Sequence, residues 1–268
     1  MKIALRGTAE KVVAVAIIAL ALLGVVLAFS QGRTLDVEFM ADSLPILFEA
    51  ARLTLFVTAV GFTTGMAIGF FVGWLRTSKH LPARGPASVW VEAIRGTPLF
   101  VQILFLFSLL GFYVPQLPNR LLITGVVALT INTSGYQAEI FRGGLQSVSA
   151  GQVEAARALG MRYWMMMRTI VLPQALRLVT PPLTNEFIAL LKASSLLFVL
   201  GVQELTYVGR ILSFGGNLFE VYALVIMIYL IMTVPLAKAV VWLERRYRIP
   251  GLGIQQEAPR GAAVGTRP

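Results

Sequence analysis

The stretch EAARALGMRYWMMMRTIVLP, residues 154–173, is a polar interruption in a chain whose other long segments are mostly apolar. Hydrophobic residues make up 57% of the 268 residues, charged residues make up 13%, and the mean hydropathy is +0.76. A soluble domain carries roughly a quarter charged residues. The composition therefore indicates a membrane protein, and the interruption needs a structural reason.

The first half of this stretch has the pattern of a short helix with marked ends. Residues 152–159 are good helix formers, and Ser149 followed by Gln152 resembles a capping box. Gly160 fits the position just after a helix end, where the backbone is often left-handed. We therefore predict a helix over 152–159 that ends at Gly160.

The second half predicts another short helix, over residues 162–170. Its aromatic and methionine side chains lie beside arginines, so it can rest in the lipid headgroup boundary or against a protein groove. Pro173 then occupies the first turn of the next helix, where a missing amide hydrogen is harmless. Two short helices joined at a glycine should form a compact knob on one side of the membrane.

A hydrocarbon core of about 30 Å needs roughly 20 apolar residues per helix. Six segments qualify, and polar residues make the fourth and fifth the weakest of them: 12–29, 46–75, 89–113, 121–141, 180–202 and 220–242. No run alternates like a barrel strand, so helices are expected to span. The first segment also resembles a secretory signal peptide, but its apolar run exceeds the usual length of about 7–15 residues, and we predict a retained helix.

Basic residues near helix ends predict the orientation. With the N-terminus in the cytoplasm, five of the 23 Lys and Arg residues lie away from the inner side: Arg33, Arg52, Arg120, Arg210 and Lys192. This topology also puts the C-terminus in the cytoplasm and makes the first outer loop acidic. Nucleic-acid binding would need basic residues clustered on one folded face, so we read the net charge of +10 as a topology signal and expect no such partner.

Several chemistries lack their residues in this sequence. The absence of cysteine excludes disulfides and thiolate metal sites, and the single His80 excludes a histidine metal cluster. The phosphate-binding pattern G-x-x-x-x-G-K-[ST] does not occur, so we expect that the chain does not hydrolyse ATP by itself.

The interruption resembles a known motif. Its residue spacing is that of the cytoplasmic EAA loop in permease subunits of bacterial and archaeal ATP-binding-cassette importers, at seven positions: Glu154, Ala155, Ala156, Gly160, Ile170, Leu172 and Pro173. Three further stretches resemble the polar amino-acid branch of that family in the same order: EAIRGTPLFVQILF (92–105), YQAEIFRGGLQSVSAGQ (136–152) and NEFIALLKASSL (185–196). The resemblance covers about residues 44–245.

The resemblance implies an all-α polytopic membrane protein with the type I importer permease fold. That fold has five core transmembrane helices, so the helix at 12–29 would be an extra N-terminal one. We expect an N-terminal helix and acidic outer loop over 1–43 and a permease domain over 44–245. The coupling loop would lie at about 142–173, and a polar cytoplasmic tail without stable structure over 246–268.

The resemblance also implies partners in the cytoplasmic (inner) membrane. The loop would dock into a separate ATPase subunit, which binds ATP and Mg²⁺, through Glu154, Ala155, Ala156, Arg157, Gly160, Leu172 and Pro173. The alanines would permit close approach, the charges would orient the contact, and Met165–Met167 would supply adaptable apolar surface. The complete importer would hold two ATPase subunits, a second permease that is identical or homologous, and an extracytoplasmic amino-acid-binding protein.

Charges at bilayer depth cost several kcal/mol unless they face the bundle or water. Six polar residues form two stripes, one on the fourth span and one on the fifth: Asn132, Tyr136 and Glu139; Asn185, Glu186 and Lys192. We predict that the stripes line the translocation path, with Glu139 available to an ammonium group and Lys192 to a carboxylate. The alternatives are hydrogen bonding between helices or a buried Glu–Lys pair, and for Glu139 also a place at the inner membrane boundary.

A second candidate site opens the third span. It comprises Glu92, Arg95, Gly96, Thr97 and Pro98. Glu92 and Arg95 are neighbours on a helix and could pair, while Gly-Thr-Pro interrupts the hydrogen-bond ladder and lets the helix bend. We predict a gate or hinge here, with an ordinary helix start at the membrane interface as the alternative.

The second span carries glycines at every fourth position: Gly61, Gly65, Gly69 and Gly73. They stack along one helix face and let another helix approach closely, which is how helices associate in lipid. We predict a packing role for this glycine stripe and no chemistry.

Two other functional classes compete with a permease subunit. A secondary carrier favours internal inverted repeats, and an intramembrane enzyme needs a nucleophile with a base, a carboxylate pair or a histidine metal set. The sequence offers neither. The leading hypothesis is the permease subunit of an ATP-driven importer for polar amino acids, which leaves open the particular amino acid and whether the permease pair is homomeric.

Overall fold

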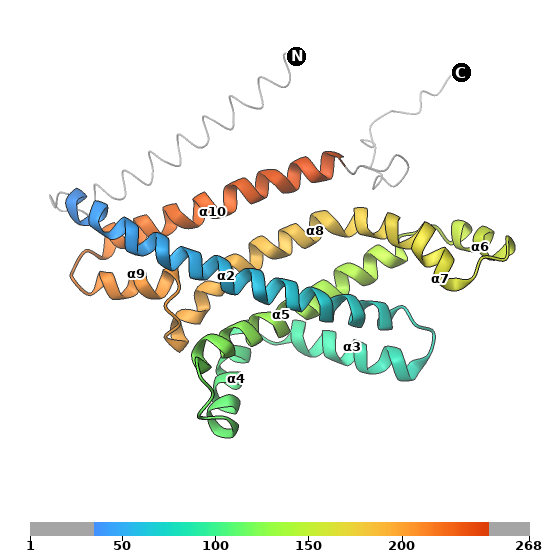
Figure 1. Cartoon of the computed structure of the whole chain (residues 1–268), viewed down its shortest axis with the longest axis horizontal. Helices are drawn as coiled ribbons and strands as arrows, with labels where there is room; N and C mark the ends of the chain where they lie inside the picture. The colour runs from blue at the N-terminus through green and yellow to red at the C-terminus, as the bar shows by residue number, and fades with distance from the viewer. Residues whose placement is uncertain (1–34, 247–268) are drawn as a thin grey trace, which may run out of the picture. The chain divides into compact units, whose positions relative to one another are not determined.

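The computed structural model describes residues 35–246, and this part of the chain is built from helices without a strand (Figure 1). The predicted helix at 12–29 and the predicted tail from residue 247 lie outside the described residues. The described residues 43–246 belong to one compact unit, and of the unit Met1–Asp42 the structure describes 35–42, in which α2 begins at Val37. The elements are α2 (Val37–Arg76), α3 (Leu81–Gly96), α4 (Leu99–Tyr113), α5 (Arg120–Gln146), α6 (Ala150–Ala158), α7 (Tyr163–Met166), the π-helix η1 (Met167–Val171), α8 (Leu172–Ala193), the 3₁₀-helix η2 (Ser194–Leu200), α9 (Leu205–Ser213) and α10 (Leu218–Arg246).

Three helical stretches of the described part are long and apolar enough to cross a membrane: Val37–Arg76, Tyr163–Leu200 and Leu218–Trp242. The first and last agree with the spans predicted at 46–75 and 220–242. α3 and α4 qualify only as a pair, and they are bent by 106° at the residues between them. The segment predicted as one span over 89–113 thus consists of two helices, which Thr97 and Pro98 separate. α5 covers the predicted fourth span, but its polar residues make it less apolar than the three stretches named above.

The predicted fifth span begins earlier in the structure than in the sequence prediction. α7 passes through η1 into α8 without a break, so the separate helix predicted over 162–170 is wrong. The π turn comes directly before Pro173, which lies in the first turn of α8 as predicted. Pro173 has no amide hydrogen for the regular ladder, and the preceding Leu172 N–H donates to Met167 O in the wider π pattern.

The end of α6 follows the prediction for Gly160. Its φ of +73° is left-handed, a conformation that glycine adopts without steric cost. The N–H of Gly160 donates to Arg157 O at 2.9 Å, and the N–H of Met161 donates to Ala156 O at 3.1 Å. These two bonds form a Schellman ending, which satisfies carbonyls that the helix leaves free.

The start of α6 does not contain the predicted capping box. The side chain of Ser149 makes no cap bond. The backbone carbonyl of Ser149 accepts from Gln152 N–H at 3.0 Å instead. The side chain of Gln152 instead accepts from Gln174 Nε2 at 2.9 Å. A tertiary contact to α8 has therefore replaced the local one.

α6 packs against the α7–η1 stretch, so the predicted compact knob is present although its second helix continues into α8. They share a small apolar cluster made of Val148, Ala156, Met166, Met167 and Val171. In Figure 1 this knob lies at the far ends of α5 and α8. We define the knob as residues 147–173 and keep that name below.

α5 holds the centre of the described fold, in contact with α3, α4 and α8 (Figure 1). The main apolar core lies around it and draws residues from α2, α4, α5, α8, η2 and the following turn: Val57, Ile103, Ala128, Leu129, Leu190, Leu197, Leu200 and Val202. The polar side chains of α5 are therefore brought next to three other helices, which makes α5 the element on which a site can form.

The glycine stripe of α2 packs directly on α5, as its spacing predicts. A Cβ at Gly61 would lie 2.9 Å from Leu129 Cβ, and one at Gly69 would lie 3.0 Å from Ser134 O. A Cβ at Gly73 would lie 2.5 Å from the backbone oxygen of Ala138. The two backbones are thus closer than any side chain on these α2 positions would allow.

A buried carboxylate that no sequence pattern indicated links α9 to α10. Glu204 is fully buried and caps α9, accepting from Thr206 N at 2.9 Å and Tyr207 N at 2.8 Å. Tyr229 Oη of α10 donates to it at 3.4 Å, and the adjacent Leu205 N–H donates to Thr54 Oγ1 of α2 at 3.0 Å. Its hydrogen bonds give Glu204 a structural role.

Candidate functional site

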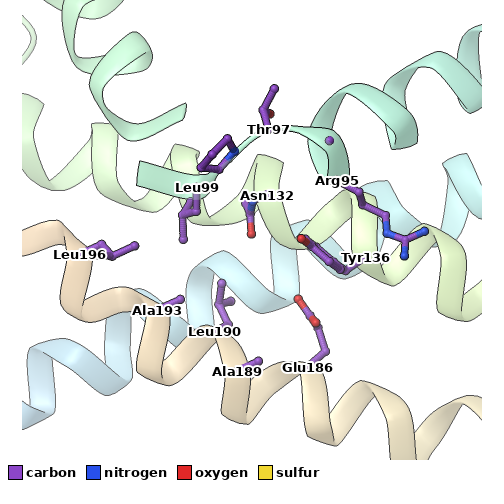
Figure 2. A pocket seen from close by; sticks show the side chains of 12 residues that line it. Arg95, Thr97, Leu99, Asn132, Tyr136, Glu186, Ala189, Leu190, Ala193 and Leu196 are labelled. Carbon is purple, nitrogen blue, oxygen red and sulfur yellow. The ribbon is translucent and has the colours of Figure 1, made fainter. Parts of the chain in front are cut away.

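A cavity of about 580 Å³ lies between the α3–α4 break, α5 and α8 (Figure 2). Its lining combines five residues of the break with two from α5, four from α8 and one from η2: Arg95, Gly96, Thr97, Pro98, Leu99, Asn132, Tyr136, Glu186, Ala189, Leu190, Ala193 and Leu196. The alanines and leucines give one apolar wall, and the polar residues converge from the other elements. We call this space the central cavity.

The break that forms one wall has an extended backbone at two residues. Thr97 has φ −118° and ψ 142°, and Pro98 has φ −65° and ψ 137°. Pro98 lacks an N–H, and its ring disfavours helical geometry at the residue before it, so the ladder stops here. The bend expected from Gly-Thr-Pro is confirmed as a change of helix direction by 106°.

A glutamine that the sequence prediction missed spans this break. Gln102 Nε2 donates to Ile94 O at 2.9 Å, to Thr97 Oγ1 at 2.8 Å and to Thr97 O at 3.2 Å. Gln102 Oε1 accepts from Asn132 Nδ2 at 3.0 Å. The available signal was a glutamine in an apolar helix, one turn after Gly-Thr-Pro.

The acidic group of the central cavity is Glu186, which is partly buried on α8. Its Oε1 accepts from Thr133 Oγ1 at 2.9 Å, and none of the ion pairs within the described residues includes it. The guanidinium of Arg95 lies 5.6 Å from the centre of the Tyr136 ring, and Figure 2 shows Tyr136 between Arg95 and Glu186. Charges of both signs thus border one cavity without forming an ion pair with each other.

Three of the predicted path residues do not line the central cavity. Glu139 forms ion pairs with Arg76 and Arg142, near the C-terminal ends of α2 and α5. Asn185 and Lys192 are exposed on another face of α8. Asn132, Tyr136 and Glu139 share one face of α5, but only Asn132 and Tyr136 line the cavity, because the cavity extends along less than two turns of this helix.

The predicted hinge residues divide in a similar way. Arg95, Gly96, Thr97 and Pro98 line the cavity, whereas Glu92 is exposed and lies outside it. The suggested pair of Glu92 with Arg95 is not among the ion pairs of the described side chains. Tyr136, seen in Figure 2, is the neighbour that Arg95 contacts.

Replacing Glu139 with glutamine should lower the melting temperature of the protein. The change leaves Arg76 and Arg142 without their shared anion, in a place where the three side chains are 16–30% exposed, and we expect a loss of roughly 1–3 kcal/mol. Glu49→Gln is the matched control, because its pair with Arg52 is 72–78% exposed and such pairs contribute about 0–1 kcal/mol. Equal thermal melts of the two variants would contradict this assignment.

The knob exposes part of its predicted coupling set and buries the rest. Glu154, Ala155, Arg157, Gly160 and Pro173 are exposed. Leu172 is partly buried, and Ala156 is only 2% exposed. Ala156 packs into the apolar cluster of the knob, and the close approach of a partner backbone at Ala155 and Ala156 stays a prediction.

The three methionines also divide. Met166 and Met167 are buried in the knob's own cluster, and Met165 is 58% exposed. The apolar surface open to another molecule comes instead from Leu159, Trp164 and Met165, of which Leu159 is 82% exposed. One helical turn points its successive side chains in different directions, so three consecutive methionines cannot share a surface.

The knob is bound to α2 through aromatic side chains. Trp74 Nε1 donates to Tyr163 Oη at 3.2 Å, and the ring of Trp74 meets that of Trp164 edge to face at 5.4 Å. Tyr163 and Trp164 also contact each other, with ring centres 5.5 Å apart. Among the described residues, no group of three or more His, Cys, Asp or Glu side chains could hold a metal ion.

This fold and this arrangement are those of the membrane component of a transporter. Residues 65–249 match the family of binding-protein-dependent transport system inner membrane components, and the chain belongs to that family. The resemblance inferred from residues 154–173 is therefore confirmed, and the chain is a membrane-embedded permease subunit of an ATP-binding-cassette transporter.

Individual relatives support the same placement. The glutamine transport system permease protein GlnP of Escherichia coli (strain K12) is 39% identical over 212 residues, which cover 77% of this chain and 95% of that relative. The arginine transport system permease protein ArgU of Corynebacterium glutamicum is 34% identical over 74% of this chain and 67% of its own length.

Solved structures show the same fold. The crystal structure of an amino acid ABC transporter with histidines matches with a TM-score of 0.74 and 38% identity, over 80% of this chain and 99% of that one. The MetNI methionine ABC transporter in an inward-facing conformation matches with a TM-score of 0.67 and 22% identity, over 78% of this chain and 99% of that one, and supports the fold alone. The type I importer permease fold predicted from the sequence is thus confirmed.

Proposed function

We propose that this chain carries a polar amino acid across the cytoplasmic membrane through the central cavity. The observation that carries the proposal is a cavity of about 580 Å³ at the break of a membrane helix, bordered by a carboxylate and a guanidinium that do not pair with each other. The relatives named as glutamine and arginine permeases support the solute class.

A zwitterionic solute complements this lining. Its ammonium group would meet Glu186 and the Asn132 amide oxygen, and its carboxylate would meet Arg95. Charged hydrogen bonds of this kind are roughly twice as strong as neutral ones. Glu186 thus takes the role that the sequence analysis assigned to Glu139, binding the ammonium group, and Arg95 takes that of Lys192, binding the carboxylate. Glu139 already forms ion pairs with two arginines.

Replacing Glu186 with glutamine should reduce the kcat/KM of uptake by at least about tenfold, because a hydrogen bond to a charged group contributes roughly 1.5–3 kcal/mol. The measurement is ATP-driven uptake by the complete importer in proteoliposomes, with L-glutamine, L-arginine and L-histidine as competitors. Glu220→Gln, on α10 and outside the cavity, is the control. If the two variants transport equally, the cavity is not the solute site.

The energy for uptake would come from a separate ATPase that binds ATP and Mg²⁺ and docks on the knob. The knob is suited to this because it presents Leu159, Trp164 and Met165 beside the exposed charges of Glu154 and Arg157. The aromatic contact of Tyr163 and Trp164 with Trp74 joins the knob to α2, and α8 leaves the knob as one continuous helix.

The importer would contain a second permease subunit. Asn185 and Lys192 are exposed on α8, and a charged side chain within a span must face protein or water rather than lipid. A second copy or a homologous permease would cover this face. Two ATPase subunits, an extracytoplasmic binding protein and cytoplasmic N- and C-termini complete the proposed arrangement.

The driving force provides the sharpest test of the class. The chain reconstituted by itself in liposomes should not accumulate solute in response to a sodium or proton gradient. The complete importer should accumulate solute when ATP is supplied. Uphill uptake by the isolated chain would replace the proposal with an ion-coupled carrier.

A further inference from the structure

The α3–α4 break creates a problem that any broken membrane helix shares. The last carbonyls of α3 have lost their helical donors, and hydrocarbon offers no water to replace them, at a cost of several kcal/mol for each unsatisfied group. Thr97 Oγ1 donates to Ala93 O at 2.8 Å and so satisfies one of these carbonyls. Gln102 Nε2 donates to Ile94 O and to Thr97 O, so one side-chain amide satisfies two further carbonyls at the break.

The other end of the same amide reaches the wall of the central cavity. Gln102 Oε1 accepts from Asn132 Nδ2, and both residues are buried, with exposures of 9% and 8%. Figure 2 shows the oxygen of Asn132 pointing into the space between Leu99, Ala193 and Leu190. A solute in the cavity therefore lies one side chain away from Gln102.

We propose that Gln102 is a positioning residue that couples solute occupancy of the central cavity to the angle of the α3–α4 break. This inference rests on the proposed function, because it needs the solute to enter the cavity. A solute donor that binds Asn132 Oδ1 fixes that amide and strengthens its Nδ2 bond to Gln102, since hydrogen bonds in a chain polarise one another. Gln102 in turn holds the carbonyls of Ile94 and Thr97 in the bent arrangement.

The experiment uses the complete importer in lipid nanodiscs. The permease sequence contains no cysteine, so two introduced cysteines are its only thiols for spin labelling, and any cysteines of the partner subunits are replaced beforehand. Val89 on α3 and Phe105 on α4 lie on opposite sides of the break, are 66% and 64% exposed and are not part of the cavity lining. Their distance distribution is measured without solute and with saturating L-glutamine, or with the amino acid that the parent importer takes up fastest.

Gln102→Met and Gln102→Asn are the test variants. Methionine keeps the length of the side chain and removes the amide, while asparagine keeps the amide and is too short to bridge Ile94 O and Asn132. The matched control is Gln137→Met, because Gln137 is also a buried glutamine of a span but donates to Phe62 O, away from the cavity. Thermal melts of all variants confirm that each is folded.

In the parent and in Gln137→Met, solute should narrow the distance distribution. In the Gln102 variants the distribution should be broad and should not respond to solute. Solute-stimulated ATPase activity and uptake kcat should fall about tenfold while KM changes less than about twofold, within the range of measured coupling energies.

Two outcomes separate this inference from the proposed function. If the parent shows uptake and a solute response and both Gln102 variants respond like Gln137→Met, Gln102 does not couple the cavity to the break. If the parent itself neither responds to nor transports any amino acid of the panel, the proposed function fails together with the inference.

Discussion

Replacing Leu159 with aspartate is expected to reduce ATP-driven uptake by about 100-fold or more, because a central contact in a protein interface contributes roughly 2–4 kcal/mol. Leu159 follows the last residue of α6 and is 82% exposed, so the fold of the permease does not depend on its side chain. If the knob docks into an ATPase, that side chain is buried on assembly, and an unpaired carboxylate there must be desolvated. Co-purification of the ATPase with the tagged permease should be lost in parallel.

Leu81→Asp provides the control for this variant. Leu81 begins α3 and is 68% exposed, and an acidic residue in the first turn of a helix is favourable. This variant should assemble and transport like the parent, and both variants should keep the parental melting temperature. Normal co-purification and uptake by Leu159→Asp would mean that the ATPase does not contact this tip of the knob.

Replacing Gly73 with leucine should prevent recovery of folded permease. A Cβ at this position would lie 2.5 Å from Ala138 O and 3.1 Å from Phe141 Cβ. The first of these neighbours is backbone, so relief requires α2 and α5 to separate along the whole glycine stripe. Overpacking costs about 1–3 kcal/mol for one added group, and the lost contacts along the stripe add to it. Size-exclusion profiles and thermal melts in detergent measure the effect.

Gly143→Leu is the matched control for Gly73. Gly143 is also a helix glycine, but no atom lies within 4 Å of a Cβ built on it. Leucine has a higher helix propensity than glycine by roughly 0.8 kcal/mol, so this variant should be as stable as the parent or more stable. Similar melting temperatures for the two variants would show that α2 can shift away from α5 at little cost.

Features that depend on spacing along one helix could be predicted from the sequence. The four-residue repeat of glycines on α2 predicted a close helix contact, and Gly160 predicted the end of α6. Gly-Thr-Pro predicted a bend, although its size of 106° makes two helices out of one predicted span. Each of these follows from backbone geometry that a few neighbouring residues determine.

Features that depend on contacts between helices could not be predicted. Asn132, Tyr136 and Glu139 lie on one face of α5, yet only the first two reach the cavity, because Glu139 pairs with an arginine 63 positions earlier in the chain. The roles of Gln102 and Thr133 were missed for the same reason. Their partners lie on other elements, and the periodicity of one helix does not show which residue of another helix it will contact.

The amino-acid sequence by itself determined that this protein is a bundle of membrane helices interrupted by a polar knob, because apolar length and motif spacing can be read along the chain. Only the tertiary structure decided which polar side chains share the central cavity and which are already paired. The reason is physical: in lipid a polar group must find a partner, and the packing of α3, α4, α5 and α8 decides which partner is within reach.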